Sequence, residues 1–266
     1  MGDPLIKKYK DRKEYWNEQY MQYWKARTSA EGKRMAKKDC VPADVSVFDS
    51  YLKRLGLKTG ETVLEVGAGF GRLIPSILKY GVKLSCIDIS PQMIRNIIAE
   101  WGDKLEDVNA VEAENLPYEH ESFDYVICWA VFDACYQSQA LHSMARVLKT
   151  GGKLMLTGKN DNYCDDDEPA FVAEVNARAK GHPNYFTNLI KLNSEISQAG
   201  LKVKNIFYFE RRGDLSENKY FIEKPECFYE YVLISEKTAN VSADFRNEVS
   251  QEFSKTFLRK KNNENP

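Results

Sequence analysis

The stretch EVGAGFGRL, residues 65–73, places a carboxylate just before three glycines at alternate positions. It follows the β-branched run TVLEV (62–66) and precedes a helical pattern, which is the setting of a ligand-binding loop. The spacing is G-x-G-x-G, not the G-x-G-x-x-G that brings a helix N-terminus to a pyrophosphate. Glu65 would repel phosphates and attract an ammonium group. The loop therefore predicts a ligand with a positive amine, a carboxylate and no phosphate.

Asp88 ends the second predicted strand, about twenty residues after this loop, where a carboxylate can accept both hydroxyls of a ribose. The ligand is therefore predicted to contain a nucleoside. Met93, one turn into the next helix, is expected either to cover one face of the base or to pack in the core. Residues 112–114, after the third strand, are expected at the edge of the base.

Short β-branched runs alternate with helical patterns between residues 61 and 158, which indicates a parallel α/β sheet with crossover helices. Ser90 and Pro91 are expected to begin one of these helices as its cap and first residue. A further helix is expected over residues 184–200. The runs VKNIFYFERR (203–212) and ECFYEYVLISEK (226–237) have no helix between them, so they are predicted to pair antiparallel at one edge.

The composition excludes some partners. A net charge of -1 argues against general binding to nucleic acid or to an anionic membrane. The first residues lack an apolar run and nothing later resembles a membrane span, so a cytoplasmic protein is expected. The six cysteines form no C-x-x-C pair and are predicted to be reduced thiols.

Four segments in a fixed order carry a family resemblance: EVGAGFGRL, CIDIS with the ensuing Met93, EAENLPYEHESFDYVICWAV and RVLKTGGKLMLT. Together they resemble the class I S-adenosylmethionine-dependent methyltransferases of small molecules. The resemblance covers residues 45–160 and implies a Rossmann-like, seven-stranded mixed sheet, parallel with one antiparallel edge strand and with helices on both faces. It also implies S-adenosylmethionine as the cofactor.

The resemblance assigns cofactor contacts position by position. The residues concerned are Glu65, Gly67, Ala68, Gly69 and Gly71 around the methionine part, Asp88, Ile89 and Met93 around the nucleoside, Glu112, Ala113 and Glu114 at the base edge, and Cys128 and Trp129 at the floor. Many relatives have Gly-Asp-Ala where this chain has Val111-Glu112-Ala113. Ala113 thus matches these relatives, whereas Glu112 replaces their aspartate.

Three domains are expected: an N-terminal helical lid (1–40), the methyltransferase domain (41–238) and a C-terminal helix with a polar tail (239–266). The lid prediction rests on an aromatic helical stripe in residues 14–27, for which simple packing is the alternative. Within it, Tyr20 and Trp24 are candidates to reach the cofactor or the acceptor, and Arg27 is a further candidate. The C-terminal stripe is expected to dock on the core or to form a homodimer contact.

Candidate acceptor-side residues follow the fourth and fifth strands. His182 is the best general-base candidate, because it lies in a loop and its ordinary pKa suits neutral pH. Asp133 is a second candidate for base or acceptor contact, and Trp129, Tyr136 and Tyr185 are candidates to bind the acceptor. The acidic run within 159–169 is interpreted as a solvated loop rather than a metal site, so no metal is expected.

The predicted function is transfer of a methyl group to an O or N atom of a small molecule. A sugar, a nucleotide-linked intermediate and a secondary metabolite are all compatible acceptors. Methylation of tRNA or protein, and cofactor binding without turnover, remain the alternatives.

Overall fold

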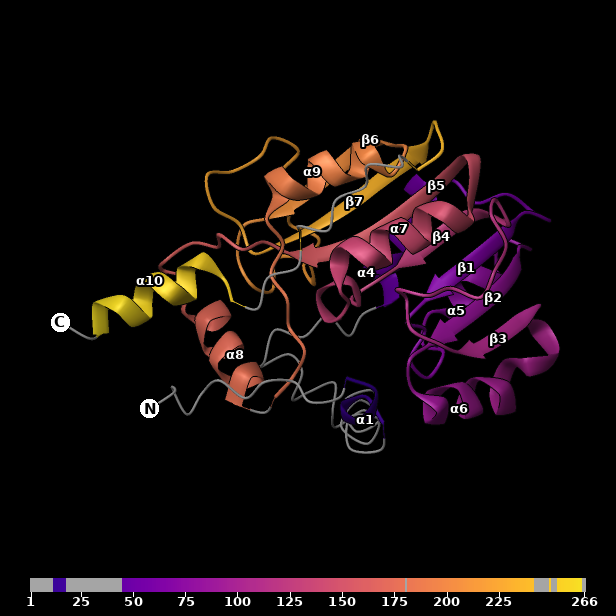
Figure 1. Cartoon of the computed structure of the whole chain (residues 1–266), viewed down its shortest axis with the longest axis horizontal. Coiled ribbons are helices and arrows are strands. Elements are labelled where there is room, and N and C mark those ends of the chain that lie inside the picture. The colour runs from indigo at the N-terminus through magenta and orange to yellow at the C-terminus, as the bar shows by residue number, and fades with distance from the viewer. Residues whose placement is uncertain (1–11, 18–44, 180, 242–248, 250–252, 265–266) are drawn as a thin grey trace.

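The computed structural model describes residues 12–17, 45–179, 181–241, 249 and 253–264. A seven-stranded sheet forms its centre, in the order β3-β2-β1-β4-β5-β7-β6 (Figure 1). The strands are β1 (Thr62–Val66), β2 (Lys83–Asp88), β3 (Asp107–Ala110), β4 (Phe123–Cys128), β5 (Leu148–Lys159), β6 (Leu201–Phe209) and β7 (Glu230–Lys237).

Strands β1 to β5 pair parallel, whereas β7 runs antiparallel to both β5 and β6. The predicted mixed, Rossmann-like sheet is thus confirmed. The reversed strand β7 lies between β5 and β6, so β6 forms the edge. Because β1 lies between β2 and β4, the chain order reverses direction at β1, and ligands of open α/β sheets bind at the carboxyl ends of the strands at such a point.

Helices cover both faces of the sheet, as predicted. The helices are α1 (Arg12–Tyr15), α4 (Val45–Leu55), α5 (Ile74–Leu78), α6 (Pro91–Trp101), α7 (Gln137–Val147), α8 (Glu168–Ala179), α9 (Leu189–Gln198) and α10 (Lys255–Glu264). Alternation along β1 explains the two layers, since successive side chains of a strand point to opposite faces. Val63 joins an apolar core with α4, α5 and α6, and Leu64 joins the core with α7 and α9.

Helix α6 begins as predicted. The Ser90 hydroxyl accepts the Met93 N–H at 3.4 Å, and Pro91 occupies the first turn. The helix predicted from residue 184 instead begins at Leu189, where the Asn188 side chain accepts the Lys191 N–H at 3.1 Å. The preceding residues are extended, because the Thr187 N–H donates to the Lys159 carbonyl at 2.7 Å.

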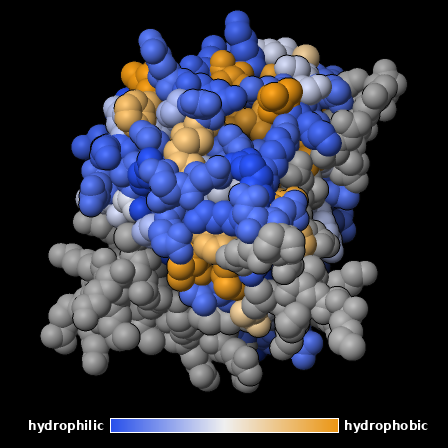
Figure 2. All heavy atoms as spheres, turned by 90° about the vertical axis from the view of Figure 1, so that its left-hand side faces the viewer, coloured by the Kyte–Doolittle hydropathy of each residue, from blue (hydrophilic) through white to orange (hydrophobic). Residues whose placement is uncertain are grey.

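The C-terminal helix differs from its prediction. Helix α10 extends to Glu264 and so includes residues predicted as a polar tail, while residues 245–248 and 250–252 lie outside the described part of the chain. Figure 2 views the end of the molecule that carries α8 and α10, where hydrophilic residues cover most of the described surface. In the part of the chain that the structure describes, no helix has the length and apolarity needed to span a bilayer.

The cysteine prediction is wrong for one pair. Cys164 and Cys227 form a disulfide, with their Cα atoms 5.0 Å apart. The fold explains it: β5 pairs with β7 through Lys159 and Glu230, so the segments after β5 and before β7 meet at one end of the sheet. The free cysteines among the described residues, Cys86, Cys128 and Cys135, are all buried, and Cys40 lies outside the described residues.

Candidate functional site

A pocket lies at the carboxyl ends of β1, β2 and β4. Its lining brings together most of the residues predicted to bind a cofactor: Glu65, Gly67, Ala68, Gly69, Asp88, Ile89, Met93, Glu112, Ala113, Glu114 and Trp129. Arg12, Trp16, Phe70, Arg72, Ala130, Val131, Ala134 and Cys135 also contribute. Cys128, predicted at the floor, is instead fully buried in the core beneath it, because its side chain points to the α7 and α9 layer.

The glycines of the loop have different roles. Gly67, Gly69 and Gly71 all have positive φ, which disfavours residues with a side chain. A Cβ on Gly67 would lie 2.6 Å from Val131 Cγ1, so this glycine lets the segment after β4 cross close above the loop. A Cβ on Gly69 would meet nothing within 4 Å, so the backbone there is open to the pocket.

Gly71 corrects one prediction. It does not line the pocket, and a Cβ there would lie 2.9 Å from Ile74 Cδ1. Its role is to let the loop pack against the start of α5. The G-x-G-x-G pattern therefore combines Gly69, whose backbone is open to the pocket, with Gly67 and Gly71, which permit close packing.

Asp88 is held by the backbone at the end of β2. Its two carboxylate oxygens accept the Gly69 N–H at 2.9 Å and the Ser90 N–H at 2.8 Å. Burial raises the pKa of Asp88 to about 6, although both hydrogen bonds act to lower it. A carboxylate fixed in this way suits the hydroxyls of a ribose, as predicted.

Glu65 is almost fully buried at the bottom of the same pocket. Burial raises its pKa to about 8, while the positive charge of Arg72 and a long hydrogen bond from the Cys86 thiol, 3.8 Å from Oε2, act to lower it. A cation bound beside Glu65 would stabilise the charged form. The pocket therefore fits a ligand that carries a positive group near Glu65 and a ribose near Asp88.

Arg12 was not predicted, yet it reaches the base-edge loop. Its Nη1 donates to Glu114 Oε1 at 2.6 Å and to the Ala134 carbonyl at 3.0 Å, and the guanidinium lies 4.1 Å from the centre of the Tyr136 ring. Glu114 Oε1 also accepts the Tyr136 N–H at 2.6 Å, so this oxygen is occupied by protein donors. A lone arginine in a polar segment shows no periodicity, so no pattern in the sequence indicated this contact.

The rest of the segment 12–17 touches two more loops. Trp16 lines the pocket, and the Ser90 hydroxyl donates to Asn17 Oδ1 at 3.2 Å. The Tyr15 hydroxyl lies 3.0 Å from His182 Nδ1, and the Trp16 and His182 ring centres are 5.1 Å apart. Tyr20, Trp24 and Arg27, the predicted lid contacts, lie outside the described residues.

The acceptor-side candidates do not line this pocket, apart from Trp129. His182 reaches its rim through Trp16. Tyr136 and Tyr185 lie near each other, with ring centres 5.9 Å apart.

Asp133 forms an ion pair with Lys159, with 2.6 Å between Oδ2 and Nζ. Lys159 Nζ also donates to Asn184 Oδ1 at 2.8 Å. The Asp133 carboxylate is thus held by a partly buried cation and does not line the pocket. The base role of Asp133 stays a prediction, and the sequence did not show that β5 brings Lys159 beside it.

The acidic run after β5 is largely exposed, and three of its carboxylates also form ion pairs. Asp165 pairs with Arg259 at 2.7 Å, Glu168 with Lys260 at 3.0 Å, and Asp166 with Arg211. Asp167 is buried, and its carboxylate accepts the Ala170 N–H at 3.1 Å at the start of α8. Across the described ranges, no cluster of three or more His, Cys, Asp or Glu side chains could hold a metal.

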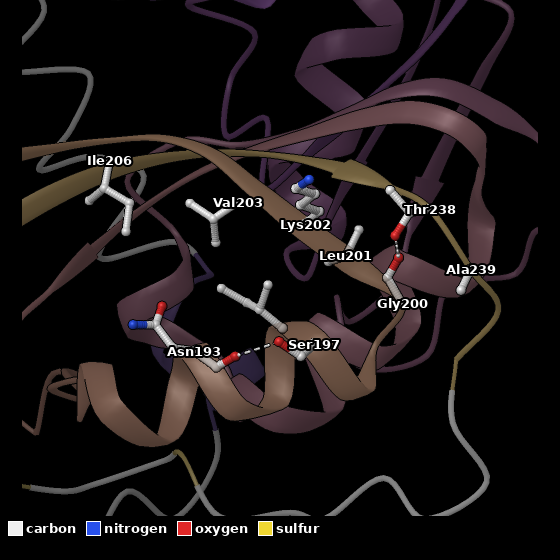
Figure 3. Close-up of a pocket in the computed structure, with 10 residues that line it drawn as sticks. Asn193, Ser197, Gly200, Leu201, Lys202, Val203, Ile206, Thr238 and Ala239 are labelled. Carbon is white, nitrogen blue, oxygen red and sulfur yellow. Dashed lines mark hydrogen bonds between the residues drawn. The ribbon is translucent and has the colours of Figure 1, made fainter.

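A second cavity lies between α9 and the first half of β6 (Figure 3). Ile196, Leu201, Val203 and Ile206 form much of its lining, and the hydrogen bonds beside it stay within the wall, from Ser197 to the Asn193 carbonyl and from Thr238 to the Gly200 carbonyl. It lies at the amino end of β6. Without a group of polar side chains that converge on it, this cavity is a weaker candidate than the pocket over β1.

Comparisons with known proteins agree with this choice. Residues 64–156 match a family model described as a methyltransferase domain. The chain is 33% identical over 106 residues to a demethylmenaquinone methyltransferase of Tropheryma whipplei, covering 39% of this chain and 44% of that protein. It is 30% identical over 156 residues to a ubiquinone biosynthesis O-methyltransferase of Xanthomonas euvesicatoria, covering 55% and 65%.

The chain thus spans less than two thirds of the length of these curated relatives. Among solved structures, a phosphoethanolamine N-methyltransferase of Haemonchus contortus in complex with S-adenosyl-L-methionine has the same fold, with a TM-score of 0.56 and 17% identity over 74% of this chain and 54% of that one. The family match begins within β1, covers β2, β3 and β4 and ends within β5, and so includes the glycine loop and Asp88. Residues 64–156 therefore resemble a methyltransferase domain, and the chain has the fold of solved methyltransferases.

Proposed function

We propose that the chain binds S-adenosylmethionine and transfers its methyl group to a small molecule. The observation that carries the proposal is the pair of buried carboxylates, Glu65 and Asp88, on neighbouring strands of one pocket. Glu65 suits the cationic methionine end of the cofactor, and Asp88 suits its ribose. A dinucleotide would bring phosphates to the same loop, where the charge of Glu65 opposes them.

The cofactor supplies an electrophilic methyl group, so the protein has to bind, orient and exclude water. Gly69 opens the loop toward the ligand, and Asp88 is held in place by two backbone N–H groups. Trp16 and Arg12 cover the pocket from the N-terminal side. We interpret the segment 12–17 as part of the lid predicted for residues 1–40.

We place the acceptor beside Trp129 and the segment that follows β4. His182 is the proposed base, because Tyr15 holds its Nδ1 and its ring packs on Trp16 at the pocket rim. Tyr136 and Tyr185 lie on this side as candidate acceptor contacts. One relative is named a ubiquinone biosynthesis O-methyltransferase, so we place phenolic hydroxyls on aromatic rings first among the O-atom and N-atom acceptors to be tested.

Calorimetric titration with S-adenosylhomocysteine tests the binding step. We expect the wild-type chain to bind, and Asp88→Ala to lose at least about tenfold in affinity while its circular dichroism spectrum stays unchanged. NADH is the control ligand and is expected not to bind. Equal affinity in wild type and variant would overturn the placement of the ribose.

A screen for S-adenosylhomocysteine formation with phenols, amines, sugars and tRNA then tests turnover. Product with a small phenol or amine supports the proposal, whereas product only with tRNA supports the alternative. Binding without turnover for any acceptor would favour a non-catalytic role.

Two further proposals concern the state of the protein. A cytoplasmic location is proposed from the sequence, although the Cys164–Cys227 disulfide is a kind of bond found mainly in oxidising compartments. Counting free thiols in protein quenched with acid at lysis tests it, because the cytoplasmic location predicts reduced cysteines. A homodimer is also proposed, and sedimentation equilibrium would decide between it and a monomer.

A further inference from the structure

Ala130 has an unusual backbone conformation where it lines the pocket. Its φ is +58°, a left-handed value that a residue with a side chain rarely adopts without support from its surroundings. The other non-glycine residues with positive φ in the described ranges, Glu121 and Asn218, do not line the pocket. Backbone strain that is retained at a ligand pocket points to a functional role.

Thr157 holds this conformation in place. The Ala130 N–H donates to the Thr157 hydroxyl oxygen at 2.6 Å, and Thr157 is buried. The pairing of β4 with β5 ends at Cys128 and Leu156, so Thr157 is the next residue of β5 and bonds the first turn beyond β4. The segment 129–131 is thus fixed from the β5 side.

Val131 fixes the same segment from the other side. It occupies the space that a Cβ on Gly67 would fill, so the segment 129–131 lies directly against the glycine loop. Because the strand order is β2-β1-β4, this segment forms the wall of the pocket opposite Asp88. A cofactor with its ribose at Asp88 would carry its sulfur over β1, next to that wall.

We propose that Thr157 is a positioning residue for methyl transfer, which holds the segment 129–131 so that its backbone contacts the methyl group on the cofactor sulfur. This inference rests on the proposed function. The C–H bonds of a methyl group on a positive sulfur are polarised, so the backbone oxygens of Trp129 and Ala130 can accept weak C–H···O contacts. The Val131 carbonyl already accepts the Ala134 N–H at 2.8 Å. Such contacts also orient the methyl group for in-line transfer.

The test compares two ligands that differ only in the methyl group and its charge, S-adenosylmethionine and S-adenosylhomocysteine. Thr157→Val keeps the side-chain shape but removes the hydrogen-bond acceptor. We expect it to weaken S-adenosylmethionine binding about three- to tenfold and to leave S-adenosylhomocysteine binding within about twofold, measured by calorimetry. Thr157→Ser keeps the acceptor oxygen and is expected to restore the wild-type ratio.

A second pair of variants changes the turn directly and leaves Thr157 in place. Ala130→Gly can adopt the left-handed conformation without strain, so it serves as the matched control with an unchanged ratio. Ala130→Val cannot adopt it readily and is expected to shift the ratio as Thr157→Val does.

An equal loss of affinity for both ligands in Thr157→Val and Ala130→Val would show a purely structural role and overturn the inference. An unchanged ratio in both variants would overturn it as well. If the wild-type chain binds neither ligand, the proposed function itself fails, so the two failures are distinguishable.

Discussion

Arg12 and Glu114 form an ion pair at 2.6 Å that joins the N-terminal segment to the loop after β3. Both side chains are nearly buried, with exposed fractions of 8% and 10%. The pair closes one side of the proposed cofactor pocket, and Trp16 extends the same cover. Cofactor release therefore requires this contact to open, if the segment acts as a lid.

Arg12→Gln is expected to speed cofactor release by about tenfold, because it removes the charge that holds the segment to Glu114. Stopped-flow fluorescence, with Trp16 as a reporter near the ligand, measures the dissociation rate. Lys13→Gln changes an exposed cation of the same helix and is the control. A rate equal to that of the control would argue against the lid.

Reduction of the Cys164–Cys227 bond is expected to destabilise the fold. The bond closes a loop with a sequence separation of 63 residues, and disulfides of this kind contribute about 2–4 kcal/mol, mainly by restricting the unfolded chain. The double variant with serine at both positions should therefore unfold at a lower temperature than the oxidised wild type. Calorimetry with and without a reducing agent measures this, and the variant should not respond to the agent.

The stability of the ligand-free protein should fall as the pH rises toward 8. Burial raises the pKa of Glu65 to about 8 from an ordinary 4.5, so between these values the folded state binds more protons than the unfolded state. The free energy of unfolding then decreases with rising pH and levels off above about 8. Glu65→Gln lacks this contribution, so the melting temperature of the variant relative to wild type should increase from pH 5.5 to pH 9.

Cofactor binding should partly reverse the rise in the pKa of Glu65. A cation beside Glu65 lowers its pKa, so binding near pH 7 is expected to release a proton in wild type and not in Glu65→Gln. Calorimetric titrations in buffers with different protonation enthalpies measure the released proton. Equal proton release by the two proteins would contradict the placement of the cationic end at Glu65.

Asp133→Ala is expected to reduce the free energy of unfolding, whether or not Asp133 takes part in proton transfer. The change leaves Lys159 with its charge in a nearly buried position, which costs about 3 kcal/mol. Chemical denaturation measures the loss. Asp133→Asn is the companion variant, because an amide can still accept from Lys159. Wild-type turnover by the Asp133→Asn enzyme would exclude the carboxylate as a base.

The sequence predicted the parts of the site that depend on local spacing. The glycine loop and Asp88 lie at fixed distances from strand ends, so their convergence followed from the order of the strands. Gly71 shows the limit of such patterns, because whether a glycine faces a ligand or a helix depends on its neighbours in space, here Ile74.

The sequence patterns did not predict the contacts between distant segments. The pairings of Arg12 with Glu114, Asp133 with Lys159 and Cys164 with Cys227 each join segments whose approach is set by the whole sheet. None of these pairings is marked by a periodic stripe or a recognisable motif. The sequence shows which of these side chains are charged or carry a thiol, but it does not show which residue each one pairs with.

The disulfide also changes the connectivity of the molecule. Residues 164–227 form a covalent ring that contains α8, α9 and the edge strand β6. A protease cut inside this ring, for instance in the exposed residues 221–224, would leave both pieces joined, so the nick would appear on a gel only after reduction. The segment between the two cysteines, including the edge strand β6, can therefore be cleaved without being shed.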